Sequence, residues 1–238
     1  MKHEELLSKL TPEEKAALLS GKTVWQTRDI PRLKIPSIFL SDGPHGIRKQ
    51  AGAGDHLGLN ASLKATCFPT AATIANSWDP DLGEEIGKAL GEEAAAQDVN
   101  IVLGPGLNMK RSPLCGRNFE YYSECGVLSG LTAAAEVSGA TENGLICYVK
   151  HFAFNDQDNY RQNNICTWLN EQSAREIYLK AFEQPIKAGG MGVMTSMNAV
   201  GPVWAGGCKA LLTNILRDEW GFHGAVITDA VVSAWYMA

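Results

Sequence analysis

Short apolar runs alternate with longer amphipathic segments along most of the chain. Strands are expected at residues 35–40, 99–103, 145–149, 192–196 and 225–228, and helices at residues 81–97, 127–140, 171–187 and 209–219. An earlier helix is predicted after Thr11, which can cap it, with Pro12 in its first turn and Glu14 completing a capping box. Apolar strands separated by helices predict a parallel sheet covered on both faces, either a closed barrel or a doubly wound open sheet.

Polar residues that directly follow the apolar runs distinguish these two folds. They are Asp42, Gly104-Pro105-Gly106, Lys150-His151, Met197-Asn198 and Asp229. In a parallel barrel these strand ends meet on one rim, where catalytic groups lie. A nucleotide-binding open sheet instead concentrates its signal in the first turn. The sequence therefore predicts an α/β fold of the (β/α)8 TIM-barrel type.

Composition narrows the functional classes. The 238 residues carry a formal charge of −5 and are 45% hydrophobic, which indicates neither a nucleic-acid partner nor an anionic membrane surface. No apolar run approaches the roughly 20 residues of a membrane span. Residues 1–5 lack the apolar core of a signal peptide, so a cytoplasmic protein is expected. Gly52-Ala53-Gly54 does not complete a dinucleotide fingerprint, and neither a cofactor nor a metal is expected.

The six cysteines give no sign of a metal or redox site. They include no CxxC pair, which argues against a zinc ribbon and a thioredoxin-like centre. Cys147 and Cys166 lie in apolar stretches and are expected to act as small buried hydrophobes. A disulfide between Cys115 and Cys125 is disfavoured in a cytoplasmic chain.

Four segments carry candidate chemistry, and each also has a plainer structural explanation. Asp42 in SDGPHGIR either presents its carboxylate on the rim or caps its own turn. Arg117 in RSPLCGRNFE lies either in a shaped site or in a solvated loop. Lys150 and His151 end a buried strand, where a single histidine is more often structural than catalytic. Asp229 ends GAVITD, either as a nucleophile at a barrel mouth or as the N-cap of a following helix.

Taken together, these segments resemble the family 3 glycoside hydrolases. The resemblance rests on SDGPHGIR, ATCFPTA, LGPGLNMKRSPLCGRNFEYYSE, KHFAFND, REIYLKAFEQPIKAG, LLTNILRDEWGFHG and VITD, in the family's order and spacing. It implies a retaining β-glucosidase-type enzyme in which Asp229 is the nucleophile and forms a covalent glycosyl intermediate. The resemblance implies five sugar-binding residues: Asp42, Arg117, Lys150, His151 and Met194. The residues that it implies for supporting them are Glu120 and Arg161.

The resemblance also implies a β-glucoside or a related β-linked oligosaccharide as the substrate. Three positions depart from the residues frequent in the family: Met197 replaces Tyr, Cys125 replaces Asp and Ala230 replaces Trp. These changes affect the expected sugar and leaving-group preference more than the reaction class. The segment after Lys150-His151 lacks the pattern of the hexosaminidase branch, which argues against N-acetylglucosamine as the main substrate.

Relatives of this branch place the acid/base glutamate in a second α/β domain that follows the barrel. The sequence stops nine residues past Asp229. Residues 1–238 are therefore expected to form the N-terminal barrel domain, incomplete at its C-terminal end and without the second domain. Besides the sugar, the expected partner is a C-terminal domain or a complementing subunit. The alternative is a catalytically silent sugar-binding fragment.

Overall fold

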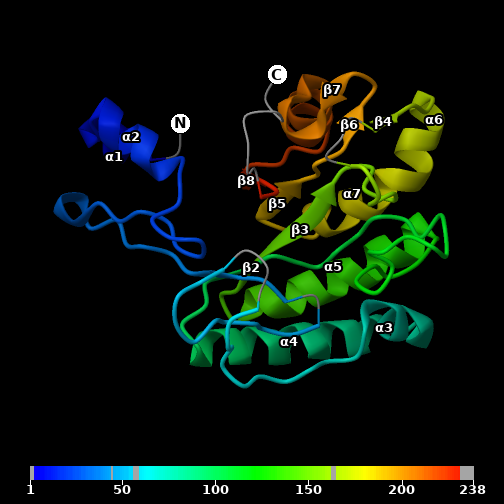
Figure 1. Cartoon of the computed structure of the whole chain (residues 1–238), viewed down its shortest axis with the longest axis horizontal. Coiled ribbons are helices and arrows are strands. Elements are labelled where there is room, and N and C mark those ends of the chain that lie inside the picture. The colour runs from blue at the N-terminus through cyan, green and yellow to red at the C-terminus, as the bar shows by residue number, and fades with distance from the viewer. Residues whose placement is uncertain (1–2, 44, 56–58, 162–164, 231–238) are drawn as a thin grey trace.

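The computed structural model describes residues 3–43, 45–55, 59–161 and 165–230. Its main sheet runs in the order β1-β2-β3-β5-β8, with every neighbouring pair parallel. The strands are β1 (Leu40–Ser41), β2 (Ile101–Val102), β3 (Ile146–Phe152), β5 (Gly192–Thr195) and β8 (Ala225–Thr228). The sheet curls and carries helices along its outer side (Figure 1). This part of the chain thus forms an incomplete α/β barrel, whose open edges among the described residues are β1 and β8.

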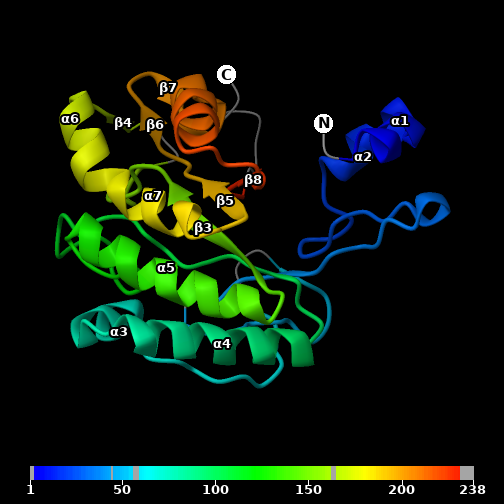
Figure 2. The ribbon, with the colours of Figure 1, turned by 180° about the vertical axis from the view of Figure 1, so that it is seen from behind.

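The helices alternate with the strands, as the apolar pattern predicts. Between β1 and β3 the chain forms α3 (Ala71–Ser77), α4 (Pro80–Ala96) and α5 (Gly126–Glu142), which make one layer in Figure 2. Before β5 it forms α6 (Glu171–Ser173), the π-helical turn η2 (Ala174–Tyr178) and α7 (Lys180–Lys187), and before β8 the π-helical segment η4 (Ala210–Glu219). None of the helices in the described ranges is long and apolar enough to cross a membrane.

Glycines let α4 and α5 approach each other closely. A methyl group on Gly87 of α4 would collide with the backbone carbonyl of Glu136 on α5. In the same way, a methyl group on Gly139 of α5 would collide with the carbonyl of Glu84 on α4. Because glycine has no side chain at the crossing, the two backbones form one compact layer over the sheet.

Side chains alternate between two apolar clusters along the strands, as the period of two residues requires. The outer cluster packs against the helices and receives from the strands Val102, Cys147, Val149 and Val193. The inner cluster is formed by Ile101, Leu103, Tyr148 and Met194. The inner cluster faces the barrel interior, and two of its residues, Leu103 and Met194, also line the candidate site.

Two parts of the fold lie outside the main sheet and its helical layer, and of these only the helix after Thr11 is predicted from the sequence. Three short strands, β4 (Cys166–Thr167), β6 (Ala199–Val200) and β7 (Val203–Trp204), form a separate sheet, with the 3-10 turn η3 (Ala205–Gly207) after it. At the N-terminal side, α1 (Glu4–Lys9) and α2 (Pro12–Leu18) contain no buried residue and are followed by the 3-10 turn η1 (Pro31–Leu33). Both views show α1 and α2 standing apart from the helical layer (Figures 1 and 2).

Several sequence predictions need correction. The strand expected at residues 35–40 contributes only Leu40 to the main sheet, as the first residue of β1, because Ile35 and Phe39 make isolated bridges to Ile30 and Gln26 instead. The helices expected at residues 171–187 and 209–219 contain π-helical turns, which an apolar pattern does not separate from α-helical turns. The capping box of Thr11 is confirmed.

The cysteines, all within the described ranges, are free thiols. Cys147 is buried as expected, whereas Cys166 is half-buried, because it lies in the small separate sheet and not in the core.

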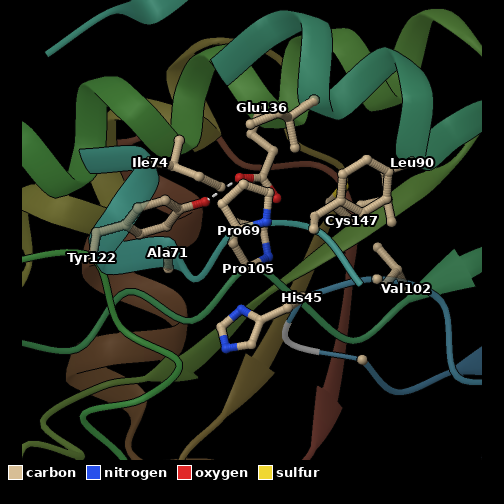
Figure 3. Close-up of a pocket in the computed structure, with 15 residues that line it drawn as sticks. His45, Pro69, Ala71, Ile74, Leu90, Val102, Pro105, Tyr122, Glu136 and Cys147 are labelled. Atoms are coloured by element: carbon tan, nitrogen blue, oxygen red, sulfur yellow. Dashed lines mark hydrogen bonds between the residues drawn. The ribbon is translucent and has the colours of Figure 1, made fainter. Parts of the chain in front are cut away.

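A buried carboxyl group lies between the helical layer and the loops that follow β1 and β2. Tyr122 Oη donates a hydrogen bond of 2.5 Å to Glu136 Oε2, beside a cavity of about 20 Å³ whose lining includes Ile74 and Leu90 (Figure 3). Glu136 makes no ion pair with a described residue. Burial raises the pKa of Glu136 to about 7, although the hydrogen bond from Tyr122 opposes the shift.

Candidate active site

A cavity of about 260 Å³ opens at the carboxyl ends of the parallel strands. Asp229 and all five residues predicted to hold a sugar lie on its wall, whereas Glu120 and Arg161 lie behind it. The complete lining consists of Val24, Trp25, Leu40, Asp42, Leu103, Arg117, Lys150, His151, Met194, Ile227, Thr228, Asp229 and Ala230. The structure therefore brings together residues that are up to 206 positions apart, from Val24 to Ala230.

The strand ends explain how these residues meet. Asp42 directly follows β1 and Asp229 directly follows β8. The neighbours Lys150 and His151 lie in β3, where the register against β5 shifts between Val149 and Phe152. Such an irregularity interrupts the alternation of side chains between the two faces of a strand. Both neighbours consequently line the same cavity.

Charged side chains of alternating sign form a continuous series behind and along the polar wall. Arg48 Nη2 lies 3.4 Å from Asp42 Oδ2, and Lys150 Nζ donates to Asp42 Oδ1 at 3.0 Å. Lys150 Nζ also lies 3.7 Å from Glu120 Oε2, and Glu120 accepts a hydrogen bond from Arg117 Nε. Lys150 and Glu120 are only 4% and 2% exposed, so each compensates a charge that would be costly to bury alone.

The series continues from Arg117 to the predicted nucleophile. Arg117 Nη1 lies 3.6 Å from Asp158 Oδ1, and that oxygen is 3.2 Å from Arg161 Nε. Arg161 Nη1 lies 3.8 Å from Asp229 Oδ2. Asp42, the second residue of the series, and Asp229, its last, line the same cavity.

Asp42 is an acidic carboxylate although its side chain is only 30% exposed. Burial by itself raises the pKa of Asp42. The ammonium group and the hydrogen bond of Lys150, together with the backbone N–H of Gly43 and the charge of Arg48, outweigh burial and bring the pKa below its ordinary value. At neutral pH, both oxygens of Asp42 are therefore available as acceptors.

His151 is neutral, and its neighbours determine which ring nitrogen carries the proton. Burial and then the three surrounding cations lower the pKa of His151 well below its ordinary value. His151 Nε2 lies 3.2 Å from Arg117 Nη2, and it must accept there because a guanidinium group only donates. The proton is consequently on Nδ1, which lies 3.2 Å from Tyr121 Oη. Tyr121 Oη also accepts from Asn155 Nδ2 at 3.0 Å.

The two oxygens of Asp229 have different surroundings. Oδ1 accepts a hydrogen bond of 2.7 Å from the backbone N–H of Ala230. Oδ2 is buried and has no hydrogen-bond partner among the described residues, since Arg161 Nη1 and His151 Nε2 are each 3.8 Å away. The backbone N–H of Asp229 is fixed by the carbonyl of Thr195 at 3.2 Å. The alternative role of Asp229 as a helix N-cap involves residues 231–238, which lie outside the described residues.

The structure also brings to the site residues for which the sequence analysis gave no role. Arg48 closes the SDGPHGIR motif and Asp158 lies shortly after the Lys-His-Phe segment, so proximity to these motifs was a usable signal. Tyr121 lies beside Glu120 in the long arginine-containing motif. Trp25 precedes every predicted strand, and no pattern in the sequence marks it.

A barrel rim that presents an open carboxylate beside a set of hydrogen-bonding side chains is typical of glycoside hydrolases. Residues 13–236 match the family described as "Glycosyl hydrolase family 3 N terminal domain", and the chain belongs to that family.

Similar proteins of known activity include two groups of glycosidases. The chain is 45% identical over 226 residues to thermostable beta-glucosidase B of Acetivibrio thermocellus, covering 94% of the chain and 30% of that protein. It is 42% identical to an exo-alpha-(1->6)-L-arabinopyranosidase of Bifidobacterium longum, covering 92% of the chain and 29% of that protein. The chain thus spans about 30% of the length of these relatives.

Solved structures confirm the predicted fold class. The beta-glucosidase 3B of Thermotoga neapolitana in complex with glucose superposes with a TM-score of 0.89 at 37% identity, covering 96% of this chain and 34% of that one. The family 3 beta-glucosidase of Bifidobacterium adolescentis gives a TM-score of 0.86 at 39% identity, covering 94% and 32%. The five-stranded sheet with its helices is therefore the TIM-barrel-like domain of this family.

Proposed function

We propose that this chain forms the sugar-binding barrel of a retaining glycoside hydrolase that acts on β-glucosides or related β-linked oligosaccharides, with Asp229 as its nucleophile. Oδ2 of Asp229 carries the proposal, because it is a buried acceptor without a hydrogen-bond partner among the described residues, on a residue that lines the cavity. A buried polar atom of this kind needs an explanation. A nucleophile directed at the cavity supplies one.

The polar wall suits a neutral ligand with many hydroxyl groups. Four acidic and four basic side chains alternate in the series from Arg48 to Asp229, so no excess charge favours an anion such as phosphate. In our proposal Asp42 accepts hydrogen bonds from sugar hydroxyls, while Lys150 and Arg117 donate to them. These bonds orient the ring and contribute binding energy that grows in the transition state.

The remaining predicted residues have narrower roles in the proposal. His151 lines the sugar-binding wall and holds Arg117 in place through Nε2, which accepts from that guanidinium group, and the apolar side chain of Met194 packs against the ring. Glu120 positions Arg117 and Lys150 from behind the wall, and Arg161 balances the charge of Asp229.

The reaction in this proposal has two displacement steps. Asp229 Oδ2 attacks the anomeric carbon, the bond to the leaving oxygen breaks, and a general acid protonates that oxygen. The conjugate base of that acid then takes a proton from water, whose oxygen attacks the same carbon. The ester to Asp229 breaks, the sugar leaves with its original configuration, and the carboxylate is restored.

The general acid comes from outside the described residues in this proposal. Among the described residues, Asp42 and Asp229 are the carboxyl groups that line the cavity, and the lowered pKa of Asp42 makes it a poor acid. We therefore propose that residues 1–238 act as the N-terminal barrel domain of a longer enzyme, with the acid supplied by a second domain or a complementing subunit. The same observation supports the alternative function, a catalytically silent sugar-binding fragment.

A fluorinated substrate separates the two functions. The reagent 2-deoxy-2-fluoroglucosyl fluoride carries a leaving group that needs no protonation, so Asp229 can be glycosylated without the acid. The ester then accumulates, because no base activates water. We expect a sugar adduct on the peptide that contains Asp229, detected by mass spectrometry, and its loss in Asp229→Asn.

Glucose binding provides the control for this labelling experiment. Calorimetry with glucose, or with a glucose-like inhibitor, shows whether the sample is folded and competent to bind. Binding without an adduct would support the silent sugar-binding function, whereas an adduct on another carboxylate would contradict the assignment of Asp229. A parallel panel of β-glucosides and α-L-arabinopyranosides tests the substrate, since similar proteins carry both activities in their names.

We also propose that the protein acts in carbohydrate metabolism in the cytoplasm. Its six cysteines are free in the structure, which suits a compartment that keeps thiols reduced. Fractionation of cells that express a tagged copy tests the location.

A further inference from the structure

We propose that Trp25 determines sugar specificity: its indole is the apolar wall on which one face of the bound pyranose ring packs. This inference rests on the proposed function, because it concerns the same cavity. Trp25 is the single residue with a Trp, Tyr or Phe side chain in the described lining of the cavity.

The cavity has one polar and one apolar side. The charged and hydrogen-bonding residues form the polar side, whereas the apolar side consists of residues that pack in one apolar cluster: Trp25, Leu40, Leu103, Met194 and Ile227. A pyranose with equatorial hydroxyls has the same division, with oxygens around its edge and C–H bonds on its two faces. An indole offers a broad, flat and rigid surface to such a face, at little cost in side-chain entropy.

The indole is held in place from the outside of the cavity. Trp25 Nε1 donates a hydrogen bond of 2.7 Å to Gln50 Oε1, and Gln50 is only 6% exposed. Gln50 is in turn fixed by Asp55, whose backbone N–H donates to Oε1 at 2.8 Å and whose Oδ2 accepts from Nε2 at 2.7 Å. Nε1, the only polar atom of the indole, thus donates to Gln50 and not to the sugar. The rest of the ring is apolar.

Backbone and core contacts fix the ring from two further directions. A methyl group on Gly54 would lie 2.7 Å from Trp25 Cδ1, so the loop backbone rests directly on the indole. On the other side, Trp25 packs against the inner apolar cluster that contains Leu103 and Met194. Trp25 is nevertheless only half-buried, which leaves part of its ring on the cavity wall. A ring held this firmly is ready to bind without rearrangement.

The position of hydroxyl groups on the sugar provides a direct test. Galactose and mannose each differ from glucose by one axial hydroxyl on the same face of the ring, whereas allose carries its axial hydroxyl on the opposite face. A hydroxyl pressed against the indole loses water and gains no partner. We therefore expect Trp25 to make the wild-type site exclude either galactose and mannose or allose, depending on which face of the sugar packs on the indole.

The experiment uses the complete polypeptide that carries these residues and measures monosaccharide affinities by competition calorimetry. Trp25→Leu keeps apolar volume in the inner cluster but removes the aromatic face. We expect about a tenfold weaker affinity for glucose, the upper range of a lost aromatic contact. The preference for glucose over one group of epimers, either galactose and mannose or allose, should fall. The preference over the other group should fall less. Trp168→Leu is the matched control, because Trp168 is 76% exposed and does not line the cavity.

Further variants keep the test informative if Trp25→Leu folds poorly. Trp25→Phe keeps a ring and should keep most of the affinity, while the tryptophan fluorescence change caused by glucose should disappear. Gln50→Leu frees the indole and should weaken glucose binding with less effect than Trp25→Leu.

The outcomes separate this inference from the proposed function. A wild-type protein that binds no glucose or glucose-like inhibitor would overturn the proposed function itself. Wild-type binding that Trp25→Leu and Trp25→Phe both leave unchanged would overturn the role of Trp25 alone. Equal loss of discrimination against both groups of epimers would indicate general loosening of the site and would also overturn it.

Discussion

Asp42 and Glu136 are both withdrawn from water, yet the fold moves their pKa values in opposite directions. Glu136 lies between helices, where Tyr122 is its hydrogen-bond donor, and burial raises its pKa to about 7. Asp42 lies at the end of β1, where Lys150 and Arg48 outweigh burial and lower its pKa.

The difference shows how the fold gives two carboxyl groups different acidities. A carboxyl group that packs between helices can share a hydrogen bond with a phenol and have a pKa of about 7, so that it is only partly ionised at neutral pH. In the proposed function Asp42 accepts hydrogen bonds from a sugar and needs to be charged, and the cations beside it keep it charged. The cations come from the loop after β1 and from β3, and only the barrel rim brings them together.

The largest expected effect comes from removing the cation at the centre of the rim. Lys150→Met leaves Asp42 and Glu120 without their shared ammonium group. Breaking a buried ion pair in this way costs about 3–5 kcal/mol, so we expect a large drop in the free energy of unfolding measured with urea. Glucose binding should be lost as well, because Asp42 becomes easier to protonate.

Lys88→Met is the matched control for this change. Lys88 also contacts two carboxylates, Glu84 and Glu142, but on the exposed surface of the helical layer. We expect little measurable change there, since solvent screens exposed pairs. A similar loss of stability in both variants would show that the rim charges have no special role.

The next largest effect concerns the pH dependence that Glu136 gives to stability. Its pKa rises from 4.5 in the unfolded chain to about 7 in the fold, so the unfolded state loses its proton first as pH increases. The stabilising contribution is complete below pH 4.5, falls as pH rises to 7 and then levels off, a total of about 3 kcal/mol. We expect Glu136→Gln to remove this component when unfolding is measured across the same pH range. An unchanged pH profile in Glu136→Gln would contradict the raised pKa.

A smaller effect is expected from replacing Asp42, the carboxylate whose pKa is lowered. Asp42→Ala removes hydrogen bonds from sugar hydroxyls to a charged acceptor, each worth about 1.5–3 kcal/mol. Glucose titrated by calorimetry should bind correspondingly more weakly, while the thermal unfolding transition should persist because Asp42 lies on the rim. Equal glucose affinity of the wild type and Asp42→Ala would show that Asp42 does not bind the sugar.

The smallest effect tests how the rim orients His151. Tyr121→Phe removes the acceptor for Nδ1–H, a hydrogen bond worth about 1 kcal/mol. We expect a few-fold weaker glucose binding and a shift of the His151 ring nitrogen resonances away from a single tautomer. Nitrogen resonances that match the wild type would show that Arg117 alone fixes the ring.

Much of the fold could be predicted because it depends on local patterns. The apolar runs that became β3 and β5 are buried almost throughout, and the run that became β8 is apolar too, although it lies at an open edge of the sheet and is partly exposed, so composition marks all three. The capping box at Thr11 and the long helices α4 and α5 follow from short-range spacing in the same way. The small sheet of β4, β6 and β7 was missed because its two-residue strands carry no periodic signal.

The candidate site could be predicted only in part. Asp42, Lys150, His151 and Asp229 follow apolar runs, so their place on a barrel rim follows from the order of the elements. The roles of Arg48 and Asp158 depend on distances across the rim, which no spacing in the chain reports. Trp25 was missed for the same reason, since it reaches the cavity from a segment that precedes the first strand.

The sequence by itself determined the order of strands and helices, the family and the residues that end each strand. Those features depend on the apolar pattern and on motifs whose members are neighbours in the chain. The tertiary structure alone decided which charges pair, which nitrogen of His151 carries its proton and which oxygen of Asp229 stays open. Electrostatic and hydrogen-bond energies change over a few ångströms, and folding alone sets distances of that kind between residues far apart in the chain.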